Sequence, residues 1–202
     1  MATGFSSRFS RARINKNAGL HRFTWDLRHE GAWDANAARS LQGGAYVSPG
    51  QYTVQLTVDG KSFSQSFNVV ADPRIKDSGV TLADLKAQEK LSLDIRNLQN
   101  TAKQTAEEIK TRRKELDTMI KAGKKVKNAK LENDELGVVL DKLVTADMIY
   151  PTPMLIDQLN YLSSMLNQAD QRPGKDAYDR YDELNKRLTS VIEEYKKVKK
   201  RV

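Results

Sequence analysis

The chain has 202 residues, of which 39% are hydrophobic and 30% are charged, and its formal net charge is +8. This hydrophobic share argues against a wholly disordered chain, and the absence of cysteine excludes disulfides, thiolate metal sites and thiol nucleophiles. No apolar run approaches the roughly 20 residues that cross a bilayer, and no secretory signal is visible after Met1. The length predicts one or two domains. The positive excess is spread over both halves, which is typical of a charged surface that keeps a protein soluble.

The first half of the chain alternates apolar and polar residues with the period of a β-strand. Three segments show this pattern: residues 21–28, 51–59 and 61–70. Asp59 and Gly60 separate the last two and predict a type I′ hairpin turn, because both turn positions need positive φ. Three strands are too few for a closed sandwich, so we expect a further strand either from residues 5–15 or from a neighbouring protein.

After residue 80 the apolar residues recur at helical spacing. Thr81 and Asp84 form a capping-box pattern, and no Pro or Gly follows until Gly123, which predicts about 60 Å of helix. Its apolar seam is interrupted by Arg112. Further helices are expected over residues 131–149, 154–169 and from 176 to the C-terminus. We therefore predict an antiparallel bundle in which the first and last helices form a stalk braced by two shorter ones.

The residue types needed for chemistry are few or badly spaced. His21 and His29 have no metal ligands at a recognisable distance in sequence. The helical carboxylates alternate with lysine and arginine, as Glu193 does with Lys197, which is typical of a solvated helix surface. We predict no catalytic, cofactor-binding or metal-binding residue, no cofactor, and no enzymatic activity.

Two sets of residues are candidates for binding. The candidate interface residues are Phe5, Phe9, Trp33 and Tyr46, whereas Trp25 and Tyr52 are assigned to the core. The candidate contacts to an anionic surface lie in the loop after the first helix and at the C-terminus: Lys121, Lys124, Lys125, Lys127, Lys197 and Lys200.

Several motifs occur in an order that resembles one protein family. They are GLHRFTWDLR from Gly19, PGQYTVQLTVDGK from Pro49, DPR from Asp72, PMLIDQLNYL from Pro153 and QRPGKDAY from Gln171. This series resembles the C-terminal region of large secreted bacterial proteins with sortilin-like, Asp-box β-propellers, which are often labelled glycosyl hydrolases. The propeller repeats, where any sugar chemistry would lie, do not occur in this chain. No catalytic residue is therefore carried over.

The resemblance implies an immunoglobulin-like β-sandwich, akin to the one in flagellar hook-cap proteins, followed by helices. The predicted fold class is thus α+β, with an all-β part before an all-α part and a sandwich that is incomplete within this chain. The expected units are an N-terminal arm over residues 1–18, the sandwich over 19–73, a linker over 74–80 and the helical bundle over 81–202. The resemblance also implies a periplasmic or extracellular location.

An incomplete sandwich exposes an edge strand, and such an edge recruits partner strands. The leading hypothesis is a non-catalytic structural module that docks onto protein subunits, as an accessory subunit or tail of an extracytoplasmic assembly with contact to a membrane surface. One alternative is an accessory domain of a carbohydrate-processing protein. Nucleic-acid binding through the lysine clusters is the second alternative, although we expect neither nucleic acid nor a small molecule as the partner.

Overall fold

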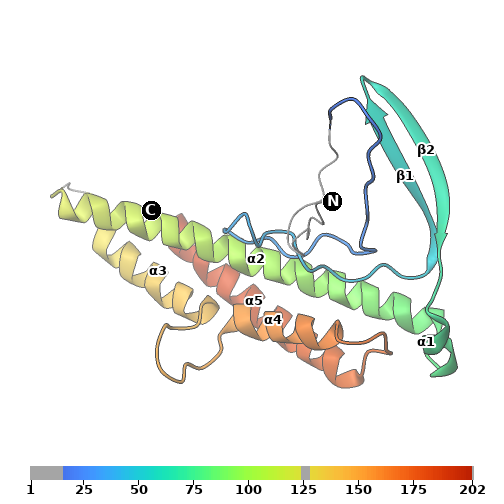
Figure 1. Cartoon of the computed structure of the whole chain (residues 1–202). Helices are drawn as coiled ribbons and strands as arrows, with labels where there is room; N and C mark the ends of the chain where they lie inside the picture. The colour runs from blue at the N-terminus through green and yellow to red at the C-terminus, as the bar shows by residue number, and fades with distance from the viewer. Residues whose placement is uncertain (1–15, 124–127, 202) are drawn as a thin grey trace.

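The computed structural model describes residues 16–123 and 128–201, and Figure 1 shows a helical bundle with a β-hairpin standing on one end. The hairpin precedes all of the helices in the chain. In order, the elements are β1 (Gly50–Val58), β2 (Lys61–Val69), α1 (Pro73–Asp77), α2 (Leu82–Lys121), α3 (Ala129–Leu143), α4 (Leu155–Leu166) and α5 (Lys175–Lys200).

The long helix α2 begins and ends where the sequence predicts. The Thr81 side chain accepts a hydrogen bond from the backbone N–H of Asp84, and the Asp84 carboxylate accepts one from the backbone N–H of Thr81. Both donors belong to the first turn, which has no intrahelical partners for them. At the other end Gly123 has a φ of +67°, a conformation that glycine adopts without steric cost. The predicted helix and its capping box are confirmed.

The helices form a three-column bundle, because α3 and α4 follow one another along the same side of α2 (Figure 1). Contacts of α2 with this column are Gln88 to Leu166, Gln99 to Asn160 and Arg112 to Glu132. The partner numbers fall as the α2 numbers rise, so α3 and α4 run antiparallel to α2. Contacts toward α5 are Gln88 to Gln171 and Glu108 to Tyr195, which rise together. The helices α2 and α5 therefore run parallel, and the column between them, α3 followed by α4, runs antiparallel to both.

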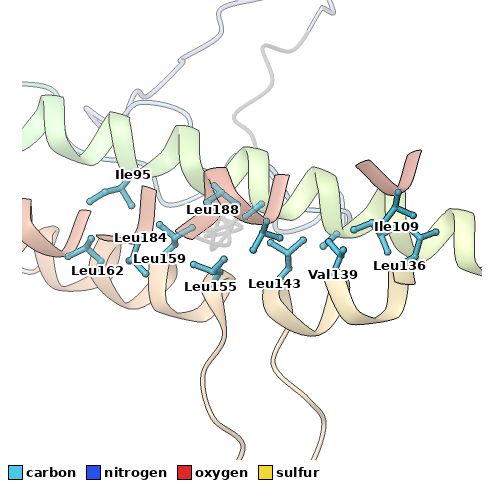
Figure 2. Packing of buried hydrophobic residues seen from close by; sticks show 14 of the residues in the cluster. Ile95, Ile109, Leu136, Val139, Leu143, Leu155, Leu159, Leu162, Leu184 and Leu188 are labelled. Atoms are coloured by element: carbon cyan, nitrogen blue, oxygen red, sulfur yellow. The ribbon is translucent and has the colours of Figure 1, made fainter. Parts of the chain in front are cut away.

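The core lies along the axis of this bundle (Figure 2). Every helix from α2 to α5 contributes aliphatic side chains at three- and four-residue spacing, as the sequence predicts. The largest fully buried side chains are Ile95, Ile109, Leu116, Leu136, Leu143, Leu155, Leu159, Leu184 and Leu188. Burying such side chains is the main favourable contribution to folding.

The split between α3 and α4 occurs earlier than the sequence pattern indicates. The predicted helix over residues 131–149 ends at Leu143, and Val144 is already extended. Thr145 accepts a hydrogen bond from the backbone N–H of Met154 and donates one to Asp157, so it ties the two ends of the connecting loop together. The intervening segment, which includes Pro151, projects from the bundle (Figure 1).

The predicted immunoglobulin-like sandwich over residues 19–73 is wrong, because the described residues contain one sheet of two strands. Residues 21–28 form no strand; only Arg28 makes an isolated bridge, to Tyr46. Alternation defines a face, but a strand also needs a neighbour whose backbone is free to pair, and the pattern of one segment does not provide that. The predicted linker over residues 74–80 contains most of α1.

The hairpin itself is confirmed. Asp59 and Gly60 have φ values of +50° and +78°, as a type I′ turn requires. The strands pair without a bulge from Val58 opposite Lys61 to Gly50 opposite Val69.

Candidate protein-docking surface

The β-hairpin has one apolar and one polar face. Residues directly opposite each other share a face, so the register places Tyr52 with Phe67 and Leu56 with Phe63. The apolar hairpin face consists of Tyr52, Val54, Leu56, Val58, Phe63, Phe67 and Val69, together with Gln65 and Lys61. The opposite face carries only small or neutral polar side chains: Gln51, Thr53, Gln55, Thr57, Ser62, Ser64, Ser66 and Asn68. A hairpin with this pattern normally packs its apolar face against another apolar surface.

The inner half of the apolar hairpin face is covered and the outer half is not. The Trp25 ring packs edge-on against Tyr52 and Phe67, with ring centroids 5.8 and 6.1 Å apart. Further out, Val54, Leu56, Val58 and Phe63 are between 44% and 60% exposed. A two-stranded hairpin of this kind is marginally stable alone, and a contiguous exposed apolar patch commonly marks an interaction site.

The two edges of the hairpin are also open. Each strand pairs only with the other in the described part of the chain. Within β1 and β2 the single charged residue is Lys61, next to the turn, and neither strand contains proline. Charges, prolines and bulges are the usual devices that keep an edge strand from pairing with other chains. Apart from Lys61, none of these devices is present within β1 and β2, which leaves both edges competent to accept a further strand.

The hairpin is held to the bundle by residues 28–48, which we call the docked loop. His29 Nε2 lies 2.5 Å from Glu89 Oε1 in α2, and Ser48 donates to the other oxygen of the same carboxylate. Further along, the backbone N–H of Trp33 donates to Asn100 Oδ1 at 2.7 Å. The docked loop therefore lies along α2 through directional polar contacts that its own sequence pattern does not reveal.

Two glycines allow the two arms of the docked loop, one on each side of its bend, to approach each other closely. A Cβ on Gly31 would lie 1.9 Å from the carbonyl oxygen of Gln42, and one on Gly44 would lie 2.0 Å from that of His29. Real Cβ atoms do not approach backbone oxygens this closely, so only glycine fits at either position. The backbone here bonds as a narrow hairpin, with His29 N donating to Ala45 O.

Docking of this loop is expected to depend on pH through Glu89. Burial raises the pKa of this carboxyl, but the hydrogen bonds from His29 and Ser48 outweigh it and hold the pKa below its ordinary value. A carboxylate with a depressed pKa in the folded state stabilises that state above the unfolded value, about 4.3 for glutamate, and loses the contribution as the pH falls through the folded value. Hydrogen exchange of residues 28–48 is therefore expected to accelerate, relative to the bundle, as acid protonates Glu89.

The matched variant is Glu89→Gln, which keeps the shape of the side chain and removes the titrating group. It is expected to exchange faster than wild type at neutral pH and to show little of the acid-induced change in this segment. Equal acid sensitivity in both proteins would show that another group controls docking.

The structure separates the predicted interface residues. Tyr46 is about half exposed, with the Arg28 guanidinium 3.6 Å from its ring centroid. Trp33 is partly buried on α2 and lines a cavity of about 790 Å³ between α2, α3 and α5, which does not include Tyr46. Phe5 and Phe9 lie outside the described residues. Trp25 and Tyr52, assigned to the core, pack together away from the bundle core and are only partly buried.

The predicted lysine contacts partly converge. Because α2 and α5 run parallel, Lys121 at the end of α2 lies toward the same end of the bundle as Lys197 and Lys200 in the last turn of α5 (Figure 1). All three side chains are exposed. Lys124, Lys125 and Lys127 fall outside the residues that the structure describes.

Several carboxylates line the cavity beside Trp33, and three of them, Glu108, Glu115 and Glu132, have hydrogen-bond partners. Arg112 binds both Glu132 and Glu115, and Tyr195 donates to Glu108 at 3.0 Å. Burial and the neighbouring Glu108 raise the pKa of Tyr195 to about 12, so this phenol stays protonated.

Within residues 16–123 and 128–201 no group of three or more His, Asp or Glu side chains could hold a metal ion. None of the described helices is long and apolar enough to cross a membrane.

The sequence pattern did not predict the exposure of four apolar residues of the hairpin: Val54, Leu56, Val58 and Phe63. They were expected to face a sandwich core, and without a second sheet they face solvent. The signal available in the sequence was the shortage of strands: an apolar hairpin face with too few partners must be covered from outside or left open.

Comparison with known proteins gives no indication of what binds this surface. Comparison of the chain with protein-family models, with curated proteins and with solved structures found no match. The resemblance of its motifs to sortilin-like C-terminal regions therefore stays a prediction, and the function has to be argued from the surface.

Proposed function

We propose that this chain is a docking module that binds another protein through the outer half of the apolar hairpin face and an adjacent strand edge. The observation that carries the proposal is the combination of four exposed apolar side chains with two strand edges that lack proline and bulges and carry a single charge, Lys61 beside the turn. The bundle serves as a rigid support that presents the hairpin. In this proposal the chain performs no chemistry of its own.

The partner that fits this surface is a protein segment in extended conformation with apolar, uncharged side chains on one face. Main-chain hydrogen bonds to an open edge would give such a segment affinity, and the apolar residues of the hairpin would select its side chains. Nucleic acid fits poorly, because phosphate contacts require lysine or arginine and the hairpin offers one lysine beside its turn. An anionic membrane surface is disfavoured at this site for the same reason.

The partner would cover the outer half of the apolar hairpin face, which the described part of this chain leaves open. The motif resemblance supports placing the module, as an accessory subunit or tail, in an extracytoplasmic assembly.

Site-specific photo-crosslinking tests the proposal. A benzophenone amino acid would replace Leu56 on the apolar face or, as the matched control, Gln55 on the polar face one residue away. After irradiation in the cells that produce the protein, the Leu56 position is expected to form a discrete adduct with a different protein, identified by mass spectrometry, and the Gln55 position is not. Equal adducts at both positions, or no adduct at Leu56, would contradict the proposal. An adduct at twice the 22.8 kDa of the chain would show instead that a second copy covers the hairpin.

A further inference from the structure

A second exposed apolar feature lies at the opposite side of the bundle from the docked loop (Figure 1). The loop between α3 and α4 carries three consecutive apolar residues, Met148, Ile149 and Tyr150, which we call the loop tip. They are 63%, 82% and 94% exposed. Runs of three exposed apolar residues are avoided in soluble proteins unless they bind something. The backbone of Tyr150 is also strained, because its φ of +59° is unfavourable for a bulky residue. Backbone strain of this kind is concentrated at functional sites, which agrees with a binding role for the loop tip.

A groove lined by both apolar and charged side chains begins where the loop tip ends; its charged lining residues are Asp157, Arg172, Asp176 and Arg180. It has a volume of about 1170 Å³ and runs between α4 and α5; we call it the α4–α5 groove. Thr152 and Pro153, just after the loop tip, line its near end, and Tyr161 and Met165 line its wall. Both of these last side chains are substantially exposed on the outer face of α4. The loop tip does not fill this groove within its own molecule, because Ile149 and Tyr150 are almost fully exposed.

We propose that the loop tip of one molecule inserts into the α4–α5 groove of a second copy, and that the exchange is reciprocal. The chain carries both halves of the contact: a projecting apolar tip of three residues and a groove with tyrosine, methionine and proline walls. Because tip and groove adjoin on one face, a two-fold axis between two molecules would place each tip in the other groove, as in an isologous dimer. A charge pair is also available, since Asp147 precedes the tip and Arg172 lies on the groove, where its side chain is 84% exposed and its Nε is 3.8 Å from Asp84 Oδ1 in the same molecule.

Disulfide trapping tests this contact directly, because the natural chain has no cysteine. Two single variants, Tyr150→Cys in the tip and Met165→Cys in the groove, are prepared with tags of different size and mixed under mild oxidation. The mixed dimer is expected to form several-fold faster than either homodimer. The control pair, Tyr150→Cys with Leu56→Cys on the hairpin, is expected to show no such preference, because the hairpin is not part of the contact.

Sedimentation measurements provide the second readout. The wild-type chain is expected to show a monomer–dimer equilibrium, and Ile149→Asp is expected to raise the dimer Kd by about tenfold or more, because the substitution removes an apolar side chain from the contact and takes a carboxylate out of water. Ile149 is exposed, so this substitution leaves the fold intact, and circular dichroism verifies that. A monomer at every concentration, or a dimer unaffected by Ile149→Asp, would overturn the proposal.

The two proposals fail separately. Leu56→Asp on the hairpin is expected to leave the dimer Kd unchanged, and Ile149→Asp is expected to leave hairpin crosslinking to the partner protein intact. A dimer weakened by Leu56→Asp rather than by Ile149→Asp would move the contact between copies to the hairpin and overturn the assignment to the loop tip.

Discussion

Leu143→Ala is expected to lower the free energy of unfolding by about 2–5 kcal/mol, the range for truncating a buried leucine to alanine. Leu143 is the last residue of α3 and is completely buried in the core (Figure 2). It sits at the break between α3 and α4, where no backbone hydrogen bonds continue from one helix into the other. Its side chain packs in the hydrophobic core at this break, so truncation to alanine leaves a cavity in the core.

The matched control for this prediction is Val138→Ala in the same helix. Val138 is 58% exposed, so its truncation is expected to change stability by no more than about 0.5 kcal/mol. Urea denaturation followed by far-UV circular dichroism measures both variants. Equal effects of the two substitutions would show that α3 is not packed as described.

The second large effect is expected at Arg112, the charged interruption of the apolar seam in α2. Its guanidinium binds Glu132 through Nε at 2.7 Å and through Nη2 at 3.1 Å. The Glu132 side chain is only 7% exposed, so Arg112→Met leaves a buried carboxylate without its partner. Breaking one side of a buried ion pair costs about 3 kcal/mol or more. We expect a stability loss of this size in the single variant.

The double variant distinguishes a lost partner from lost packing. Arg112→Met combined with Glu132→Leu removes both charges and is expected to return the free energy of unfolding to within about 1 kcal/mol of wild type. Lys110→Met, on the exposed side of α2, is the control for replacing a cation by methionine and is expected to change stability by less than about 0.5 kcal/mol. If the double variant is as unstable as Arg112→Met alone, the ion pair is not the source of the effect.

Local signals in the sequence located the elements whose structure depends on local interactions. The capping box at Thr81, the Asp59-Gly60 turn and the leucine spacing of α4 are each determined within a few residues of the chain, and each is present in the structure. The interruption at Arg112 was visible in the pattern. Its partner Glu132 was not, because the spacing of α2 alone says nothing about which residue of α3 lies beside it.

The failures concern contacts between segments far apart in the chain. The alternation around Trp25 defined an apolar face, but this segment does not join the ladder of the hairpin: Trp25 packs against the rings of Tyr52 and Phe67, and Phe23 and Leu27 are 51% and 40% exposed. The docked loop depends on Glu89 and Asn100 in α2, which lie between 41 and 67 residues from their partners in the loop, and no periodicity points to such contacts. The apolar hairpin face was therefore identified correctly as apolar and assigned wrongly to a closed sandwich.

The parallel course of α2 and α5 has an electrostatic consequence. Two parallel helices point the partial negative charges of their C-terminal carbonyl groups, about half an elementary charge each, toward the same end of the bundle, and the start of α3 at that end offsets about one of them. Lysines occupy the last turn of both helices: Lys121 in α2 and Lys197, Lys199 and Lys200 in α5. The macrodipoles favour lysine at these positions, but the roughly half a charge that remains cancels only a small part of the charge of four lysines. The lysines therefore stabilise both helix ends, and most of their positive charge stays available to an approaching phosphate.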